Sequence, residues 1–193
     1  LMTHERDDPA SLDAFPQFRE AIEPIREAGR LGCVLAQFPQ SFGPSDANRD
    51  YLVFLRDQLP DSPVVCEFRS AQWADESTFG LLRQLDLGYC CVDEPAIQGL
   101  MPRVSVATSS VGYLRFHGRN AAKWYEHEEA FERYDYLYGG PELAEWIPGV
   151  RELAANTDTQ FVFFNNHYNA QAVANADLFM EILVEASIDV AGT

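Results

Sequence analysis

The sequence predicts an α/β protein built around parallel strands. Five short and nearly continuous apolar runs support this prediction, at residues 31–37, 64–69, 88–93, 113–117 and 161–166. Runs of this length and composition are typical of strands that helices cover on both faces. Segments with helical periodicity separate most of these runs, and this alternation favours parallel pairing with right-handed crossovers.

A helix is expected before the first strand. Asp8 and Pro9 predict its start, because they read as an N-cap followed by a proline in the first turn. Four apolar residues share one helical face: Phe15, Phe18, Ile22 and Ile25. We expect Pro16 and Pro24 to kink or divide this segment, since proline cannot donate a helical hydrogen bond, and Gly29 to end it.

Further helices are expected after the strands. Residues 45–46 start one after the first strand, residues 75–85 form another after the second, and Pro141 starts a third before the last strand. A longer helix covers residues 171–185 at the end of the chain. Its periodicity predicts four inward-facing residues: Val173, Ala176, Met180 and Leu183.

Length and composition narrow the class of protein. The 193 residues suit a single domain over residues 1–193, and no apolar run approaches the roughly 20 residues of a membrane helix. A net charge of −16 makes nucleic acids and anionic membranes poor partners. Four cysteines without a C-x-x-C spacing favour reduced thiols in a cytoplasmic protein. The oligomeric state is not predicted.

Polar side chains end all five predicted strands, and parallel sheets bind ligands at this end. Alternation along a strand places Glu67 with Arg69 on one face, and Arg115 with His117 on one face, with Arg119 continuing the pattern. Four residues hold equivalent terminal positions in the other strands: Gln37, Asp93, Asn165 and Asn166. The sequence therefore predicts a ligand site at the strand ends.

Glu67 is the leading candidate for a catalytic residue. It lies between Cys66 and Phe68, and we expect partial burial to raise the pKa of its carboxyl into the range of a general acid or base. The alternative is a structural ion pair between Glu67 and an arginine. His117 is a candidate proton carrier, with a purely structural histidine as its alternative.

Arg69, Arg115 and Arg119 are candidates for binding a phosphate or carboxylate group. Pairing with Glu67 and Asp93 is the alternative, and the two interpretations are compatible. Asn165 and Asn166 could clamp a ligand or satisfy backbone groups. His4, Glu67, Asp93 and His117 form a conceivable metal set, but no known ligand spacing supports it, so we predict no metal ligands and keep a divalent cation as an open alternative.

A long loop over residues 118–139 is rich in aromatic residues. Such a loop beside strand ends acts either as a lid or pocket wall, or as a satellite hydrophobic cluster. The sequence contains no phosphate-binding G-x-x-x-x-G-K-S/T loop, no G-x-G-x-x-G and no G-x-S-x-G motif. Common nucleotide-dependent phosphoryl transfer and serine hydrolysis are therefore not expected.

Several stretches resemble the YecE-like family, also called domain of unknown function 72. They are THER at 3–6, QFPQSF at 37–42, EFRSAQW at 67–73, LRFHGR at 114–119, RYDYLY at 133–138 and FNNH at 164–167. Six such stretches in the family's order make the resemblance specific. Two departures are Ser70, where histidine or asparagine is frequent, and Ala170, where glycine is usual.

This resemblance implies a TIM-type (β/α) barrel from which about the first three strands are missing in this chain. It also implies a set of recurrent polar positions, namely His4, Arg6, Gln37, Glu67, Arg69, Trp73, Arg115, His117, Arg119, Tyr136, Asn165 and Asn166. Because the family has no established activity, the resemblance carries over a fold and a site but no reaction.

Two functions are consistent with these observations. The first is a hydrolase or isomerase for a phosphorylated or sugar-like anion, with metal-assisted phosphoester cleavage as a special case. Glu67 would transfer protons with help from His117, the arginines would hold negative charge, and Trp73 and Tyr136 would wall the pocket. The second is a protein that binds an anionic metabolite or a protein partner without turnover.

Overall fold

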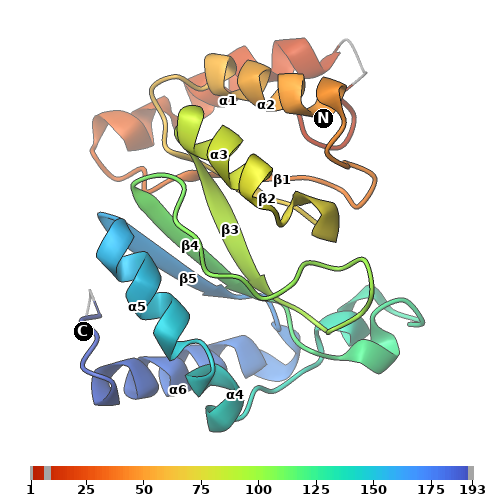
Figure 1. Ribbon diagram of the computed structural model, residues 1–193, viewed down its shortest axis with the longest axis vertical. Helices are drawn as coiled ribbons and strands as arrows, with labels where there is room; N and C mark the ends of the chain where they lie inside the picture. The colour runs from red at the N-terminus through yellow and green to blue at the C-terminus, as the bar shows by residue number, and fades with distance from the viewer. Residues whose placement is uncertain (1, 7–9, 191–193) are drawn as a thin grey trace.

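A single parallel sheet forms the centre of the computed structural model, which describes residues 2–6 and 10–190 (Figure 1). Its strand order follows the sequence. The strands are β1 (Val34–Gln37), β2 (Val64–Glu67), β3 (Leu87–Asp93), β4 (Val111–Phe116) and β5 (Thr159–Phe164). The predicted α/β class and parallel pairing are confirmed, and all five predicted strands are present, with their ends shifted by at most three residues.

The sheet curls into a half-barrel (Figure 1). Within the described residues β1 and β5 are the two edges of the sheet, so the barrel is not closed; this arrangement is consistent with a partial TIM-type barrel. Strands β2 and β3 are buried along their whole length, as their continuous apolar sequences require, whereas Phe163 on β5 remains 46% exposed. The concave face is thus more open near β5 than at the centre of the sheet.

In the part of the chain that the structure describes, six α-helices accompany the strands (Figure 1). They are α1 (Ala10–Glu27), α2 (Asp46–Gln58), α3 (Glu76–Gln84), α4 (Gly140–Ala144), α5 (Ile147–Asn156) and α6 (Gln171–Glu185). Side-chain caps mark the N-termini of two helices. Ser45 accepts the Asn48 N–H at 3.3 Å at the start of α2, and Asp75 accepts the Thr78 N–H at 2.7 Å at the start of α3. Helix α3 packs on β3, α5 on β4 and β5, and α6 on β5.

Helix α1 differs from its prediction. It runs unbroken over 18 residues, with Pro16 and Pro24 both inside it. A proline removes one hydrogen bond, and packing can hold the remaining turns together. Phe15 supplies such packing, since it is fully buried and meets the ring of Phe54 edge-on at 5.5 Å. Ile25, expected on the same buried face, is 47% exposed, and the predicted cap at residues 8–9 lies outside the described residues.

Helix α6 has the predicted bounds but a different inward face. Asn175, Phe179 and Leu183 are buried, whereas Val173 and Met180 are exposed. Buried residues at intervals of four define the face that packs on β5. Hydrophobic periodicity missed this face because one of its members is an asparagine, whose side chain accepts the Tyr138 N–H at 3.0 Å and donates to the Tyr138 carbonyl at 2.9 Å.

The segment between β4 and β5 is also more divided than expected. In place of one helix starting at Pro141, it contains the short α4 and then α5. The loop over residues 118–139 holds two 3-10 turns, η2 (Ala121–Lys123) and η3 (Ala130–Tyr134). This loop and the one after β3 lie at the right of Figure 1, beyond the carboxyl ends of the strands.

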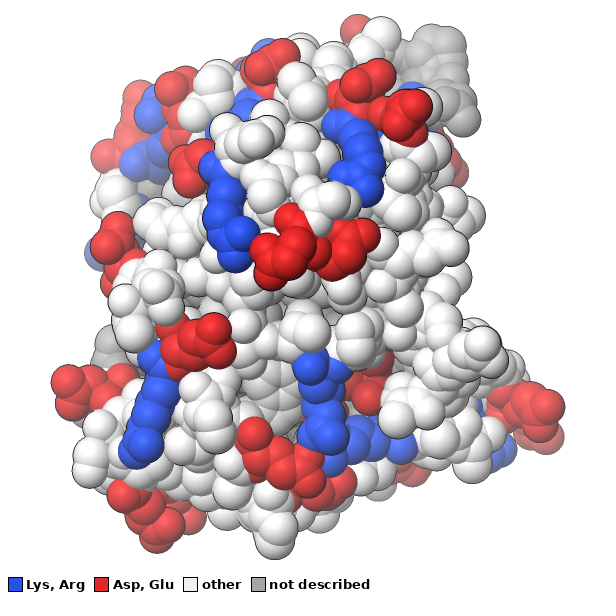
Figure 2. Space-filling view, viewed as in Figure 1, with Lys and Arg blue, Asp and Glu red and all other residues white. Residues whose placement is uncertain are grey.

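On the face shown in Figure 2, the acidic residues do not gather in one patch, although they outnumber the basic residues in the chain. There, acidic and basic side chains lie next to one another, with uncharged residues between the groups. None of the described helices is long and apolar enough to cross a membrane.

Candidate functional site

The strand registers bring predicted site residues from four strands onto the concave face. Gln37 pairs with Glu67 across β1 and β2, and Val92 pairs with Arg115 across β3 and β4. Arg115 in turn pairs with Phe163, so Asn165 continues the same face just beyond β5. Because successive side chains point to opposite faces, this alignment sends these groups toward one another at the carboxyl end of the sheet.

Glu67 is the centre of the resulting cluster and is fully buried. Its Oε2 accepts from Arg115 Nη1 at 2.5 Å, and its Oε1 lies 3.1 Å from both Arg69 Nη2 and His117 Nε2. Burial raises the pKa of Glu67, but the His117 hydrogen bond and the two guanidinium charges outweigh it and bring the pKa down to about 2. The expectation of a raised pKa was therefore wrong, and Glu67 is an anchored anion at neutral pH.

His117 is fully buried beside Glu67. Burial lowers the pKa of its imidazole, which is therefore neutral near pH 7. The Asn165 amide nitrogen lies 3.3 Å from His117 Nδ1, so a proton on Nε2 satisfies both contacts: Nε2–H donates to Glu67, and Nδ1 accepts from Asn165. Its hydrogen bonds thus hold His117 in one tautomer.

Arg115 completes a ring of interactions. Besides Glu67, it donates to Gln37 Oε1 and to Asn165 Oδ1, each at 3.4 Å. We call these residues the rim cluster: Gln37, Glu67, Arg69, Arg115, His117 and Asn165. Only 14% of the Arg69 side chain and 17% of the Arg115 side chain are exposed, and these two cations are the charges of the cluster that reach solvent.

Glu94 flanks the rim cluster and was missed in the sequence. It is buried; its Oε1 accepts the Met101 N–H at 2.7 Å, and its Oε2 lies 3.5 Å from Arg69 Nη1. Burial raises its pKa to about 7, although the Met101 N–H and Arg69 oppose the shift. Alternation from Val92, which pairs with Arg115, places Glu94 on the same face, but the sequence alone does not show which residues of neighbouring strands are paired.

Asp93 belongs to a different network on the convex side. One residue before Glu94, it points to the opposite face, where its carboxylate accepts two hydrogen bonds from Arg119 at 2.7 and 2.8 Å. Tyr138 and Trp146 donate to the same carboxylate at 2.8 and 2.7 Å. The structure therefore does not bring Arg119 to Arg69 and Arg115, and Asp93 is fully engaged in packing these elements together.

Other predicted site residues also lie apart from the rim cluster. Trp73 is buried in a stack with Phe42 and Phe68, so it does not wall a pocket. Tyr136 donates to Glu142 at 2.5 Å in the convex network. Asn166 is buried and donates to the Tyr136 carbonyl and to Asn175, each at 2.8 Å. These three hold loops and helices against the sheet.

His4 and Arg6 lie near the start of the chain and contact other groups. The His4 ring bonds to the Thr3 hydroxyl at 3.0 Å. Arg6 donates to Asn48 at 3.3 Å, and its guanidinium lies 4.4 Å from the centre of the Phe42 ring. Among the described contacts, none joins either residue to the rim cluster.

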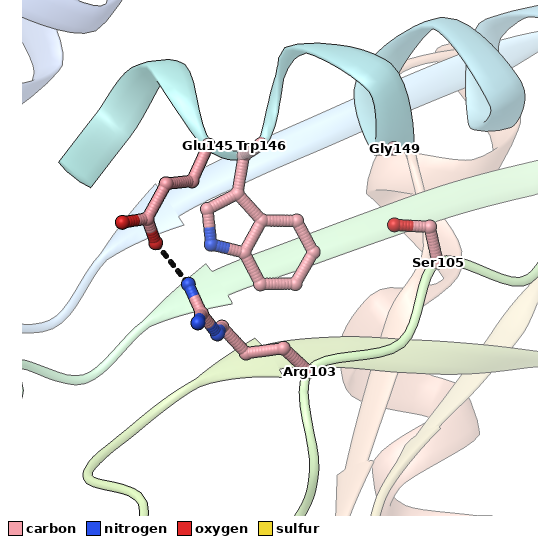
Figure 3. A pocket seen from close by; sticks show the side chains of 5 residues that line it. All are labelled: Arg103, Ser105, Glu145, Trp146 and Gly149. Carbon is pink, nitrogen blue, oxygen red and sulfur yellow. Dashed lines mark hydrogen bonds and ion pairs between the residues drawn. The ribbon is translucent and has the colours of Figure 1, made fainter. Parts of the chain in front are cut away.

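An open hollow lies beside the convex network (Figure 3). It measures about 320 Å³ and is lined by Arg103, Ser105, Glu145, Trp146 and Gly149. Arg103 and Glu145 form an ion pair across its opening, as Figure 3 shows. None of the predicted site residues lines it. In the part of the chain that the structure describes, no group of three or more His, Cys, Asp or Glu side chains is arranged to hold a metal ion.

Together these features define an α/β protein with a half-barrel of parallel strands and a charged cluster at their carboxyl ends. The model of the family described as "Protein of unknown function DUF72" matches residues 1–191. The chain belongs to this family, which confirms the resemblance to domain of unknown function 72.

Relatives agree with this assignment. The UPF0759 protein YunF of Bacillus subtilis is 32% identical over 181 residues, which are 89% of this chain. The crystal structure of a DUF72 family protein from Thermotoga maritima is similar with a TM-score of 0.88 and 40% identity, over 95% of this chain and 70% of that one. A DUF72 family protein from Enterococcus faecalis gives a TM-score of 0.82 and 28% identity, over 89% of this chain and 66% of that one. The chain spans 64% of the length of the Bacillus protein.

Proposed function

We propose that the rim cluster binds a small anionic molecule through Arg69 and Arg115, and that Glu94 exchanges a proton with it. The reaction class that fits is hydrolysis or isomerisation of a phosphorylated or sugar-like compound. The observation that carries the proposal is the arrangement of two partly exposed guanidiniums over one buried anion, Glu67, with Glu94 beside them.

The charge balance supports an anionic ligand. Arg69 and Arg115 bring two positive charges, and Glu67 neutralises one of them. With Glu94 protonated, one positive charge remains on the cluster, in a chain whose net charge is −16. A phosphate or carboxylate can compensate this charge and accept the planar N–H groups of the two arginines.

The two carboxyl groups divide the chemistry between them. Glu67 has a pKa of about 2 and stays ionised, so its role is to orient Arg69 and Arg115. Glu94 has a pKa of about 7, which matches a group that both gives and accepts protons at neutral pH. Its Oε2 is buried and makes no hydrogen bond among the described residues; its one ion pair there is the 3.5 Å contact with Arg69, which leaves an acceptor position for a ligand donor. Glu94 thus replaces Glu67 as the proposed acid or base.

A binding protein without turnover is the second candidate. The observation in its favour is that the strand-end charges Glu67, Asp93 and Arg119 are already paired within the chain. The two candidates differ in the effect of Glu94→Gln. If the protein is an enzyme, Glu94→Gln abolishes turnover and leaves the affinity for the anion unchanged. If it is a binding protein, neither the wild type nor Glu94→Gln turns over a substrate, and both bind the anion equally well.

The binding step can be tested by calorimetric titration with inorganic phosphate and glucose 6-phosphate, with and without Mg²⁺. Arg115→Gln removes one cation and is expected to weaken binding about tenfold or more, since charge-assisted hydrogen bonds contribute roughly 1.5–3 kcal/mol each. Arg69→Lys keeps the charge but not the fork geometry, and should lose less affinity.

Arg83→Gln is the matched control, because Arg83 is an exposed arginine on α3 with a long surface ion pair to Glu76. Circular dichroism confirms that each variant is folded before titration. Equal affinities in the wild type and in Arg115→Gln would refute the assignment of the anion site.

A further inference from the structure

We propose that the anion bound at the rim cluster carries a ring, and that this ring lies against an aromatic shelf formed by Phe131, Tyr134, His167 and Tyr168. This inference rests on the proposed function, because it names the kind of molecule that occupies the same site. The shelf comes from two short turns, η3 after β4 and η4 (Tyr168–Ala170) after β5.

The shelf consists of two pairs of rings, which the neighbouring residues His167 and Tyr168 join along the chain, and one of the pairs reaches the rim cluster. Phe131 and Tyr168 stack with their ring centres 4.7 Å apart and their planes only 6° from parallel. Tyr134 lies 5.6 Å from the His167 ring and 6.4 Å from the ring of His117, which is part of the rim cluster. The rings therefore extend from the buried charges outward across the carboxyl ends of β4 and β5.

Asn165 connects the shelf to the charges. Its side chain bonds to Arg115 at 3.4 Å and to His117 at 3.3 Å, and its carbonyl oxygen lies 3.0 Å from His167 Nδ1. A ligand whose anionic group meets Arg115 can thus place its remaining atoms beside Tyr134 and His167. Asn165 alone spans the distance between the Arg115 guanidinium and the His167 ring. This short distance suits an anion that carries a single ring.

Exposure distinguishes the shelf from ordinary packing of the loop. Trp124 and Tyr138 are almost fully buried and already fill the space between the loop and the body of the protein. Phe131 is 39% exposed, and His167 is exposed as well. Ring surfaces left partly open near the Arg115 guanidinium are suited to stacking on a ligand ring, because stacked rings gain contact energy beyond simple burial.

The backbone behind the shelf is strained, which is a second and independent observation. Asn169 and Ala170 follow Tyr168 directly, and both have left-handed conformations with φ of 49° and 59°. Two successive residues other than glycine in this region are costly, and such strain is concentrated at ligand-binding sites. The tight turn projects His167 and Tyr168 toward η3.

The test compares three probes by calorimetric titration: inorganic phosphate, butyl phosphate and phenyl phosphate. Phenyl phosphate is expected to bind about tenfold more tightly than butyl phosphate, which matches the upper range for a stacked ring pair. Tyr134→Ala and His167→Ala should each remove most of this preference and leave the affinity for inorganic phosphate within about twofold. A cyclic sugar phosphate, glucose 6-phosphate, distinguishes a sugar ring from an aromatic one.

Tyr125→Ala is the matched control, since Tyr125 is 61% exposed in the same loop and belongs to no ring contact of the shelf. Tyr134→Leu keeps an apolar side chain of similar bulk but has no ring that can stack. It provides the same test if Tyr134→Ala does not fold. Equal affinities for butyl and phenyl phosphate, with inorganic phosphate still bound, would overturn the shelf alone. Failure of all four probes to bind would overturn the proposed anion site as well.

Discussion

Glu67 and Glu94 contact the same arginine yet have pKa shifts in opposite directions. Both are buried, and burial alone raises the pKa of a carboxyl group. Glu67 has Arg115 and His117 in addition to Arg69, whereas Glu94 has one backbone N–H and a longer 3.5 Å contact with Arg69. The number and distance of positive partners, rather than depth in the protein, decide which carboxyl is a fixed anion and which can titrate.

Glu94→Gln is expected to change how stability depends on pH. The unfolded chain ionises Glu94 near pH 4.5, but the folded chain holds the proton until about pH 7. The raised pKa therefore contributes stability that is fully present below pH 4.5 and is lost as the pH rises through 7. Over this interval the wild type should lose about 3 kcal/mol of unfolding free energy relative to Glu94→Gln.

Urea unfolding of both proteins at pH 4.5, 6, 7 and 8 measures this difference. The low pKa of Glu67 affects stability only below about pH 4.5, so it does not overlap with this interval. Glu76→Gln, at an exposed acidic side chain, provides the comparison variant. Parallel curves for the wild type and Glu94→Gln would show that Glu94 ionises normally.

At the scale of elements, alternation and capping account for much of the structure. Strand parity correctly placed Arg115 on one face with His117, whereas Asp93, which was expected in the same site, bonds to Arg119 on the opposite side of the sheet. The cap at Asp75 marked the start of α3 to within one residue. Helix α6 shows the limit of such patterns, because its buried face is chosen by a hydrogen bond from Asn175 to a distant loop.

Ala170→Gly is expected to stabilise the protein. The left-handed backbone at Ala170 costs about 1–2 kcal/mol for a residue with a Cβ, and glycine removes this cost while adding entropy to the unfolded chain. The net gain should be about 0.5–1 kcal/mol, measured as a rise in the midpoint of thermal or urea unfolding. By resemblance to the family, glycine is usual at this position, and a φ of 59° is a conformation that glycine adopts without strain.

Ala174→Gly is the opposing control within α6. Ala174 is exposed inside the helix, where glycine costs up to about 1 kcal/mol. If Ala170→Gly lowers stability by a similar amount, the left-handed turn is not strained.

At the scale of the whole molecule, the rim cluster links strands that are far apart in the sequence. Arg115 on β4 contacts Glu67 on β2, Gln37 on β1 and Asn165 after β5. These contacts cross the concave face in addition to the backbone pairing of neighbouring strands. The cluster is therefore part of the architecture of the half-barrel as well as a candidate site.

Glu67→Gln should consequently destabilise the entire domain. It leaves Arg69 and Arg115 without their shared anion, and loss of one partner of a buried ion pair costs about 3–5 kcal/mol. Urea unfolding followed by circular dichroism and by tryptophan fluorescence measures the change. Glu23→Gln, which breaks the exposed pair between Glu23 and Arg26, should cost no more than about 1 kcal/mol. Similar losses in both variants would argue against a structural role for the cluster.

The sequence alone determined the class of fold, the five strands and the strand ends that meet on the concave face. These depend on periodicity, which neighbouring residues encode. Only the tertiary structure decided that Glu67 is held ionised, that Glu94 is the titrating carboxyl, and that Trp73 and Arg119 serve packing. A pKa and a buried contact depend on groups brought from distant parts of the chain, and no local pattern records which of them will meet.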